Sequence, residues 1–313
     1  MSPAGAQFTK ETDRSGAFRR QRNRFTDRVL DDPDARWPVQ PHRYRLIWSR
    51  ACPWAHRSKI VLGLLGLDRV ISVGTVDPVR DEKGWRFGLD EDGRDPVLGI
   101  RHLAEAYTTT DPGYDGRVTV PVLVDVERGR VATNDFPQMT LDFSTQWRAY
   151  HRDGAPDLYP EPLREEIDAV NEVVYADVNN GVYRCGFAST QEAYEEAFGR
   201  LFARLDWLSE RLEHQRYLVG DQLTEADIRL FTTLVRFDAA YHGHFKCNRN
   251  KLTEMPVLWA YARDIFQTPG FGETVDFGHI KRHYYGTHKR INPNGIVPLG
   301  PDESGWLTPH GRG

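Results

Sequence analysis

The chain has 313 residues, of which 39% are hydrophobic and 12% aromatic, which suits a folded core and not a disordered protein. Its formal net charge of −4 lacks the strongly basic balance of nucleic-acid-binding domains, so we expect no nucleic-acid partner. No apolar run approaches the length of a membrane span, and the N-terminus lacks the apolar core of a secretory signal. Three widely spaced cysteines make no disulfide framework, so we expect a cytoplasmic protein without membrane contact.

Residues 1–40 are polar, rich in arginine and aspartate, and carry only isolated aromatic side chains. Such a segment cannot bury a core of its own. We expect it to lie over the main body as an N-terminal arm, and a partly disordered tail is the alternative.

A strand–helix–strand pattern begins at Tyr44. Residues 44–49 form a short β-type run, residues 55–67 space their apolar side chains as a helix does, and residues 70–77 are rich in β-branched residues. This order predicts a βαβ unit in which the two strands are parallel and the helix crosses over between them.

The stretch 78–116 is rich in turn residues, and we expect it to be irregular. Two further β-type runs follow around the turn "ERGR", and a helix is expected from about Asp135. Pro121 begins the first of these runs and is a candidate for a cis peptide bond after Val120, with an ordinary trans proline as the alternative. The order βαβ and then ββα predicts a thioredoxin-like domain over residues 41–152.

The run "DGAPDLYPEP", residues 153–162, is rich in proline and acidic residues and marks the predicted domain boundary. Beyond it apolar residues recur at spacings of three and four, so residues 153–313 are predicted to be all-helical. Thr190 and Thr224 stand where N-cap residues are expected, and Asp227 completes a capping-box spacing with Thr224. The predicted fold is therefore α/β followed by all-α.

The candidate reactive residue is Cys52, in the stretch "WSRACPWAHRSK" at the predicted strand-to-helix turn. At such a turn the first N–H groups and the dipole of the helix point at the sulfur, which favours the thiolate and lowers the pKa of the thiol. Ala55 stands where a dithiol motif would have its second cysteine, so an external thiol must resolve any mixed disulfide. The alternative is a buried structural cysteine.

The other two cysteines, Cys185 and Cys247, have no Cys-x-x-Cys partner and are expected to be structural. The histidines are scattered, and the run "YHGHF" is too short and isolated to argue for zinc. We therefore expect no metal.

The chain resembles the Xi-class glutathione transferases, the S-glutathionyl-hydroquinone reductases, from about Ser15 to Pro301. The motifs that carry the resemblance are "ACPWAHR", "GWRF", "GRVTVPVL", "NNGVYRCGFASTQEAYEEA", "RYLVGDQLTEADIRLFTTLVRFD", "GHFKCN" and "GHIKRHYYGTHKRINPNGIVPLGP". The resemblance implies a thioredoxin-like domain, a helical transferase domain, a homodimer and a low-molecular-weight thiol as co-substrate. It also implies that Cys52 attacks the sulfur of a thiol-conjugated hydroquinone, releases the hydroquinone and forms a mixed disulfide that a second thiol resolves.

The resemblance assigns roles to further residues. Tyr183 and Tyr284 match tyrosines of the quinol pocket, whose hydroxyls could hydrogen-bond or protonate the departing phenolate. Tyr285 and Arg282 are further candidates for that pocket. The residues implied for thiol binding lie in the first domain: Trp54, Trp85, Arg117, Val120, Pro121, Asn134 and Asp135. Without the resemblance, each tyrosine would be interpreted first as an ordinary residue at the edge of a core.

The match fails at "TNDFPQM", where the family has Asn-Glu-Ser-Ser or Asn-Glu-Ser-Ala and uses the Glu and Ser to bind the γ-glutamyl end of glutathione. Here the acidic side chain is the shorter Asp135, Phe136 replaces the serine, and Pro137 removes an N–H. Losing polar partners should be costly for glutathione. We therefore hypothesise a different thiol, and the arginine-rich composition makes mycothiol in an actinobacterium the leading candidate. The alternative is that backbone contacts suffice and glutathione still binds.

The predicted function is a reductase that removes glutathione or mycothiol from S-conjugated hydroquinones. Two alternatives stay open: a general thioltransferase or dehydroascorbate-type reductase, and a non-catalytic binding protein with the transferase fold. Cys52 and the two pocket tyrosines argue against the non-catalytic alternative.

Overall fold

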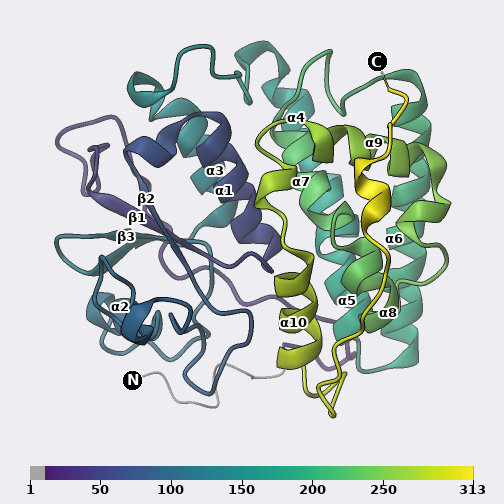
Figure 1. The fold of residues 1–313 in the computed structure, drawn as a ribbon, viewed down its shortest axis with the longest axis horizontal. Coiled ribbons are helices and arrows are strands. Elements are labelled where there is room, and N and C mark those ends of the chain that lie inside the picture. Colours follow the sequence, from purple (N-terminus) through teal and green to yellow (C-terminus); the bar gives the residue numbers. More distant parts are fainter. Residues whose placement is uncertain (1–10, 313) are drawn as a thin grey trace. The chain divides into compact units, whose positions relative to one another are not determined.

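The computed structural model describes residues 11–312, which divide into two compact units. Within the described part of the chain, unit 1 contains Gln21–Pro156, and unit 2 contains Glu11–Arg20 together with the residues from Asp157 onward. Figure 1 shows the strands that characterise unit 1 and the helices that make up unit 2.

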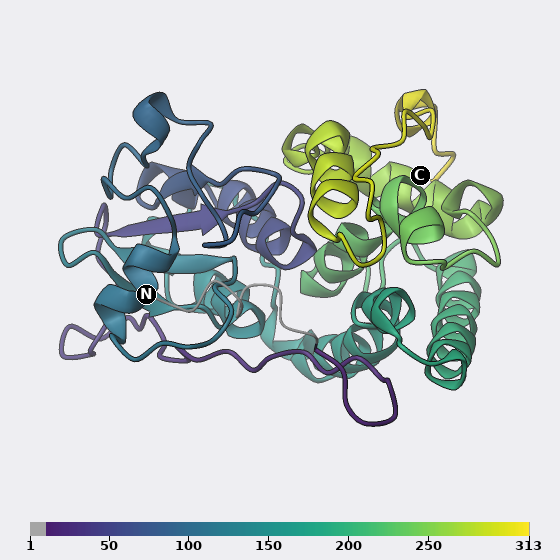
Figure 2. The ribbon, with the colours of Figure 1, turned by 90° about the horizontal axis from the view of Figure 1, so that it is seen from below.

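The predicted N-terminal arm is divided between the two units. Its first ten residues lie outside the described part of the chain, Glu11–Arg20 group with unit 2, and the remainder groups with unit 1. Phe25 attaches the arm to unit 1, because its N–H donates to Asn134 Oδ1 at 3.0 Å and its carbonyl accepts from the Asn134 N–H at 2.9 Å. The ring of Phe25 also packs against Tyr107 and Tyr114. Figure 2 shows the arm as an extended, dark purple trace.

Unit 1 is built on a four-stranded sheet in the order β2-β1-β3-β4. The strands are β1 (Tyr44–Trp48), β2 (Ser72–Thr75), β3 (Val122–Asp125) and β4 (Arg130–Thr133). β1 pairs with β2 in parallel and with β3 antiparallel, and β3 pairs with β4 antiparallel. A parallel pair needs a crossover connection, which helix α1 (Pro53–Leu64) supplies. The predicted βαβ unit and the hairpin after it are confirmed, and the fold is thioredoxin-like.

The helices of unit 1 cover this sheet. Helix α3 (Phe136–Thr145) packs against α1, and α2 (Ala104–Thr110) packs against β4. The two central strands are buried at every position because they have neighbours on both sides and on both faces. Three short 3₁₀ turns complete the unit: η2 (Leu67–Arg69), η3 (Glu91–Gly93) and η4 (Arg148–Tyr150).

The prediction that residues 78–116 are irregular is wrong for one part, since they include helix α2 (Ala104–Thr110). This helix ends in three threonines, a residue type that lowers helix propensity and suggests a turn. In the structure each threonine hydroxyl donates to the backbone carbonyl four residues earlier, at 2.7 to 3.0 Å. The threonine hydroxyls therefore find hydrogen-bond acceptors within their own helix and do not end it.

The described part of unit 2 is built from helices. They are α4 (Arg164–Val174), α5 (Gly181–Phe187), α6 (Gln191–His214), α7 (Glu225–Leu234), α8 (His242–His244), α9 (Pro256–Gln267) and α10 (Phe277–Thr287). Two π-helical segments, η6 (Tyr175–Asn179) and η7 (Phe237–Tyr241), join consecutive helices. The 3₁₀ turns are η5 (Glu161–Leu163), η8 (Leu252–Glu254), η9 (Gly272–Thr274) and η10 (Ser304–Leu307). Across residues 11–312 none of the helices is long and apolar enough to cross a membrane.

The two predicted N-caps are confirmed. The Thr190 hydroxyl accepts from the Ala193 N–H at 3.3 Å and begins α6. At the start of α7, the Thr224 N–H donates to Asp227 Oδ2 at 2.9 Å, which forms the predicted capping box. Asp227 is fully buried, and burial raises the pKa of its carboxyl group, although its hydrogen bonds act in the opposite direction.

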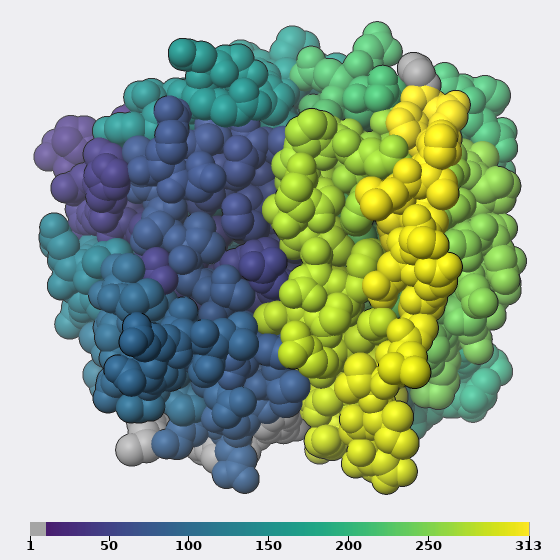
Figure 3. Space-filling model, in the orientation of Figure 1, coloured from purple at the N-terminus to yellow at the C-terminus, as the bar shows by residue number. Residues whose placement is uncertain are grey.

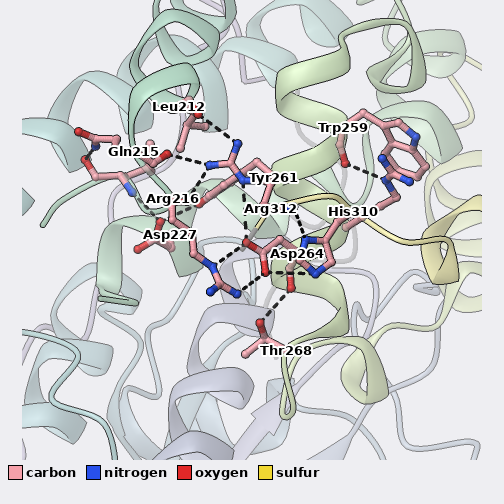
Figure 4. A network of polar contacts seen from close by, with 12 residues as sticks. Leu212, Gln215, Arg216, Asp227, Trp259, Tyr261, Asp264, Thr268, His310 and Arg312 are labelled. Carbon is pink, nitrogen blue, oxygen red and sulfur yellow. Dashed lines mark hydrogen bonds and ion pairs between the residues drawn. The ribbon is translucent and has the colours of Figure 1, made fainter. Parts of the chain in front are cut away.

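The C-terminal segment runs over the helices of unit 2 as the yellow band in Figure 3 and is anchored at a buried carboxylate, Asp264 on α9. Arg216 donates to both oxygens of Asp264, at 2.9 and 3.0 Å. His310 Nε2 and Arg312 Nε lie 3.7 and 3.9 Å from the same carboxylate (Figure 4). Arg312 also donates to three backbone carbonyls at and beyond the end of α6, those of Leu212, Gln215 and Arg216. The Arg312 side chain thus supplies part of the C-cap of α6.

Replacing Asp264 with alanine should lower the free energy of unfolding by about 2 to 4 kcal/mol, because it leaves the guanidinium groups of Arg216 and Arg312 without their shared partner. Urea unfolding followed by circular dichroism measures this. Asp206→Ala is the matched control, since the Asp206–Arg249 ion pair is exposed to solvent and should contribute less than about 1 kcal/mol. Equal losses in the two variants would contradict the role of Asp264 as an anchor.

Candidate functional site

Cys52 lies at the turn between β1 and α1, where the sequence places it, and it is the N-cap residue of α1. Its backbone is extended, with φ −77° and ψ 117°, and its carbonyl accepts the first helical hydrogen bond from the His56 N–H at 2.9 Å. Pro53 occupies the first helical position, which suits its fixed φ and needs no N–H. The first-turn N–H groups and the positive end of the helix dipole therefore lie at the end of α1 that carries the sulfur.

The thiol of Cys52 contacts the loop that precedes β3. Its Sγ lies 3.4 Å from the carbonyl oxygen of Val120, and the side chain is half-buried. The peptide bond between Val120 and Pro121 is cis, as predicted. The hydrophobic core of unit 1 includes Trp85 and Val120, and Cys52 packs against it. The structure therefore brings four of the predicted residues together. Cys52, Val120 and Pro121 meet at the sulfur, and Trp85 belongs to the core against which Cys52 packs.

Aromatic side chains line the start of α1. Trp54 is almost fully buried, and its ring centroid lies 4.8 Å from that of Phe136 on α3. The Arg57 guanidinium lies over the Trp54 ring, 4.7 Å from its centroid. Phe136, which occupies the serine position of the family pattern, is thus in direct contact with the tryptophan of the "CPWA" turn.

The acidic residue at the start of α3 is already engaged. Asp135 is the N-cap residue of α3, but its side chain makes no capping bond. Its carboxylate accepts from Asn23 Nδ2 at 3.3 Å. Burial raises the pKa of Asp135, and the hydrogen bond from Asn23 offsets part of that rise. Asp135 is thus a short, partly desolvated carboxyl group directly before Phe136 in the chain.

Asn134 serves the fold of unit 1. Besides holding Phe25, it donates through Nδ2 to the hydroxyls of Tyr107 and Thr119, both at 3.2 Å. Arg117 contributes its backbone to a similar link, since its N–H donates to Gln21 Oε1 at 2.8 Å. The roles of Asn134 and Arg117 in thiol binding stay predictions.

The two predicted tyrosines of unit 2 are hydrogen-bonded to each other. Tyr183 comes from α5 and Tyr284 from α10, and their hydroxyl oxygens are 2.7 Å apart. A third hydroxyl, that of Tyr241 in η7, lies 2.9 Å from Tyr284. Burial raises the pKa of both Tyr241 and Tyr284 well above the usual value.

Sequence reasoning missed Tyr241. It is 43 residues from Tyr284, and no helical or strand spacing connects the two. The available signal was its place in the aromatic run "FDAAYHGHF", which leads directly into the "GHFKCN" motif. Because that run includes a π-helical segment, a 3.6-residue period would have placed its side chains on the wrong face.

The two further pocket candidates lie differently from Tyr284. Tyr285 is half-buried, with its ring 4.6 Å from that of His244, and burial raises the pKa of its hydroxyl. Arg282 is exposed, and its Nε donates to the Gly278 carbonyl of its own helix at 3.2 Å. The structure does not bring Arg282 into the tyrosine cluster.

Cys185 and Cys247 are both buried in unit 2. Burial, together with the neighbouring Cys185 thiol, raises the pKa of Cys247 well above its usual value. A buried protonated thiol is unreactive, which agrees with the structural role that we expected. Among residues 11–312 there is no group of three or more histidine, cysteine or acidic side chains that could hold a metal ion.

Comparison with known families supports the fold. Residues 191–264 match the family described as glutathione S-transferase, C-terminal domain. The chain is 47% identical over 271 residues to the glutathionyl-hydroquinone reductase PcpF of Sphingobium chlorophenolicum, an alignment that covers 86% of each protein.

Two solved structures have the same fold over nearly the whole chain. A glutathione transferase from Gordonia bronchialis is 62% identical, with a TM-score of 0.91 and coverage of 92% of this chain and 90% of that one. The glutathione-S-transferase Xi from Phanerochaete chrysosporium is 42% identical, with a TM-score of 0.90 and coverage of 95% and 96%. On these identities and coverages, the chain belongs to the Xi class of glutathione transferases, the family of the glutathionyl-hydroquinone reductases.

Proposed function

We propose that the protein is a thiol-dependent reductase that removes a low-molecular-weight thiol from S-conjugated hydroquinones. The observation that carries this proposal is the position of Cys52 at the N-terminus of α1, with its sulfur 3.4 Å from the carbonyl of Val120 beside a cis proline. The name of PcpF, a glutathionyl-hydroquinone reductase, supports the choice of substrate class.

The proposed reaction has two steps. The Cys52 thiolate attacks the conjugate's sulfur, a sulfur–sulfur bond forms, and the carbon–sulfur bond breaks. The conjugate reacts as its keto tautomer, so the electron pair of the broken carbon–sulfur bond moves onto the adjacent carbonyl oxygen. The ring leaves as the aromatic phenolate, and a proton makes it a free hydroquinone. A second thiolate then attacks the mixed disulfide, releases the symmetrical disulfide and restores the Cys52 thiolate. Ala55 offers no sulfur, so the second thiol must come from solution.

Tyr183 and Tyr284 are the proposed source of the proton for the phenolate. A phenol is a general acid of suitable strength for a phenolate leaving group, because the two oxygens have similar basicity. Their mutual hydrogen bond at 2.7 Å holds the two hydroxyl oxygens in contact. Tyr285 remains a proposed neighbour of the substrate, and we propose Arg282 in that role with the resemblance as its support.

The proposed binding site for the thiol consists of unit 1 residues near the Cys52 turn or on the loops that support it. The backbone of Val120 would pair with the cysteinyl part of the co-substrate, since it already contacts Cys52 Sγ. The remaining members are Trp54, Trp85, Arg117, Pro121, Asn134 and Asp135. We also propose a homodimer, a cytoplasmic location and a division of the chain at about residue 153; the resemblance and the composition support these.

The thiol itself is either glutathione or mycothiol, and two observations favour mycothiol. Phe136 places a ring, not a hydroxyl, against Trp54, and the Asp135 carboxylate already binds Asn23. Glutathione presents an ammonium and a carboxylate at its γ-glutamyl end, which would lose water without full compensation there. Mycothiol keeps the cysteine but has no γ-glutamyl group.

Replacing Cys52 with serine should lower turnover of a hydroquinone conjugate by roughly 1,000-fold or more, because a serine hydroxyl is a poor nucleophile for sulfur. Hydroquinone release measured by liquid chromatography tests this. The wild-type protein should also gain the mass of one thiol when it is mixed with conjugate alone. Cys185→Ala is the matched control and should retain turnover, so activity that survives in Cys52→Ser would exclude the mechanism.

The wild-type protein should reduce mycothionyl-hydroquinone with a higher kcat/KM than glutathionyl-hydroquinone. The double variant Asp135→Glu, Phe136→Ser restores the family pattern and should move the preference toward glutathione by about 10-fold or more, the value of one or two recovered hydrogen bonds. Phe136→Leu is the control, because it opens space without adding a polar partner. A wild-type preference for glutathione would reject the mycothiol proposal and leave the reductase proposal standing.

A further inference from the structure

The three tyrosine hydroxyls of unit 2 form a chain that runs inward from the surface. Tyr183 is 9% exposed, Tyr284 is 1% exposed and Tyr241 is fully buried. Tyr284 lies in the middle, 2.7 Å from the Tyr183 hydroxyl and 2.9 Å from the Tyr241 hydroxyl. Each hydroxyl has one proton to donate, so two internal hydrogen bonds leave one proton for donation at one end of the chain.

A fully buried guanidinium, that of Arg236, stands at the start of the segment that carries the inner tyrosine. Arg236 precedes η7, and its carbonyl accepts from the Ala240 and Tyr241 N–H groups at 2.9 and 3.3 Å. Its Nη1 donates to the Thr232 carbonyl at 2.7 Å. A guanidinium keeps its charge even when buried. Its positive charge lowers the pKa of both Tyr241 and Tyr284, in opposition to the larger effect of burial.

Other polar and titratable groups also face the cluster, and one of them, Arg20, carries the same charge as Arg236. The Arg20 guanidinium lies 4.8 Å from the ring centroid of Tyr183, at the outer end. Three histidine rings lie within 5.3 to 6.4 Å of the Tyr284 ring: His244, His283 and His288. Burial lowers the pKa of His244 to about 4, so it is neutral at neutral pH. On the inner side, the Cys247 N–H donates to the Tyr241 carbonyl, and its buried thiol is protonated.

We propose that Arg236 is a positioning residue for proton delivery: it holds the negative charge that the hydroxyl chain develops when Tyr183 gives its proton to the departing phenolate. The proposal rests on the proposed function. As the phenolate oxygen takes the Tyr183 proton, the Tyr284 proton moves to Tyr183 and the Tyr241 proton moves to Tyr284. The negative charge then lies on Tyr241, one turn from Arg236. The thiol that resolves the mixed disulfide releases a proton when it becomes a thiolate, and this proton restores the chain.

This arrangement has a consequence that a purely structural role would not have. A weakly basic phenolate leaves almost unaided, whereas a strongly basic one needs the proton in the transition state. The contribution of Arg236 should therefore grow with the basicity of the leaving phenolate. Chlorine substituents on the hydroquinone lower that basicity in steps and provide the series of substrates for a test.

The experiment compares wild type, Arg236→Met and Arg236→Lys on conjugates of unsubstituted and increasingly chlorinated hydroquinones. We expect Arg236→Met to lose about 100-fold in kcat on the unsubstituted conjugate, and progressively less as chlorines are added. Arg236→Lys keeps a positive charge and should retain kcat within about 10-fold of wild type. The same variants are assayed on a thiol mixed disulfide, whose leaving thiolate needs no phenolic proton, and there Arg236→Met should match wild type.

The outcomes separate the two proposals. If wild type releases no hydroquinone from any conjugate, the reductase proposal fails. If wild type is active and Arg236→Met loses the same factor on every conjugate, or loses as much on the mixed disulfide, the role of Arg236 is rejected. Should Arg236→Met fail to fold, Tyr241→Phe removes the inner hydroxyl and must show the same dependence on chlorination. Tyr194→Phe is its matched control, since the Tyr194 hydroxyl donates to the Lys246 carbonyl outside the cluster.

Discussion

A polar group that leaves water must find a partner inside the protein, and this constraint determines the architecture around both groups of candidate residues. In unit 1 the Asn134 amide joins the N-terminal arm to the loop before β3, the same loop whose Val120 carbonyl meets the Cys52 thiol. In unit 2 the buried Asp227 carboxylate caps α7 and also accepts from the Leu218 N–H, so one side chain fixes a helix start and the turn before it. Satisfying these groups holds the loop before β3 and the start of α7 in place.

The placement of Cys52 follows from local rules, which is why the sequence predicted it. A strand, a cysteine and a proline followed by a helical pattern leave little choice about the turn. The two N-caps and the hairpin are likewise encoded within a few residues. Helix α2 could not be recognised in the same way, because its threonines favour helix only once their hydroxyls bond to their own helix. Nor could Tyr241 be joined to Tyr284, since their contact depends on how η7 and α10 pack.

At Asp135 and Phe136, the proposed change of co-substrate needs no change in the fold or in the chemistry. In this proposal the nucleophile, the proline turn and the supporting core are separate from the residues that would recognise the far end of the thiol. Replacing a hydroxyl with the Phe136 ring adds apolar contact with Trp54 and therefore need not destabilise the protein. The change would instead weaken the binding of glutathione, because its charged γ-glutamyl group would be desolvated beside an aromatic ring. Specificity for the thiol can therefore change while the Cys52 reaction is kept.

The tyrosine cluster depends on a less common feature, the two π-helical segments of unit 2. Each inserts extra backbone into a helical run, and such segments are retained where they redirect a side chain that has a function. η6 directly precedes the helix that carries Tyr183, and η7 ends at Tyr241 itself. Asn179, the last residue of η6, donates to Arg229 O and Thr233 Oγ1 on α7, shortly before η7 begins. A continuous α-helix in place of either segment would rotate its tyrosine by a large part of a turn, about 100° for each residue removed. The contact among the three hydroxyls therefore depends on η6 and η7 together. The hydrogen bonds of buried Asn179 connect the two, because they join η6 to α7, the helix that leads into η7.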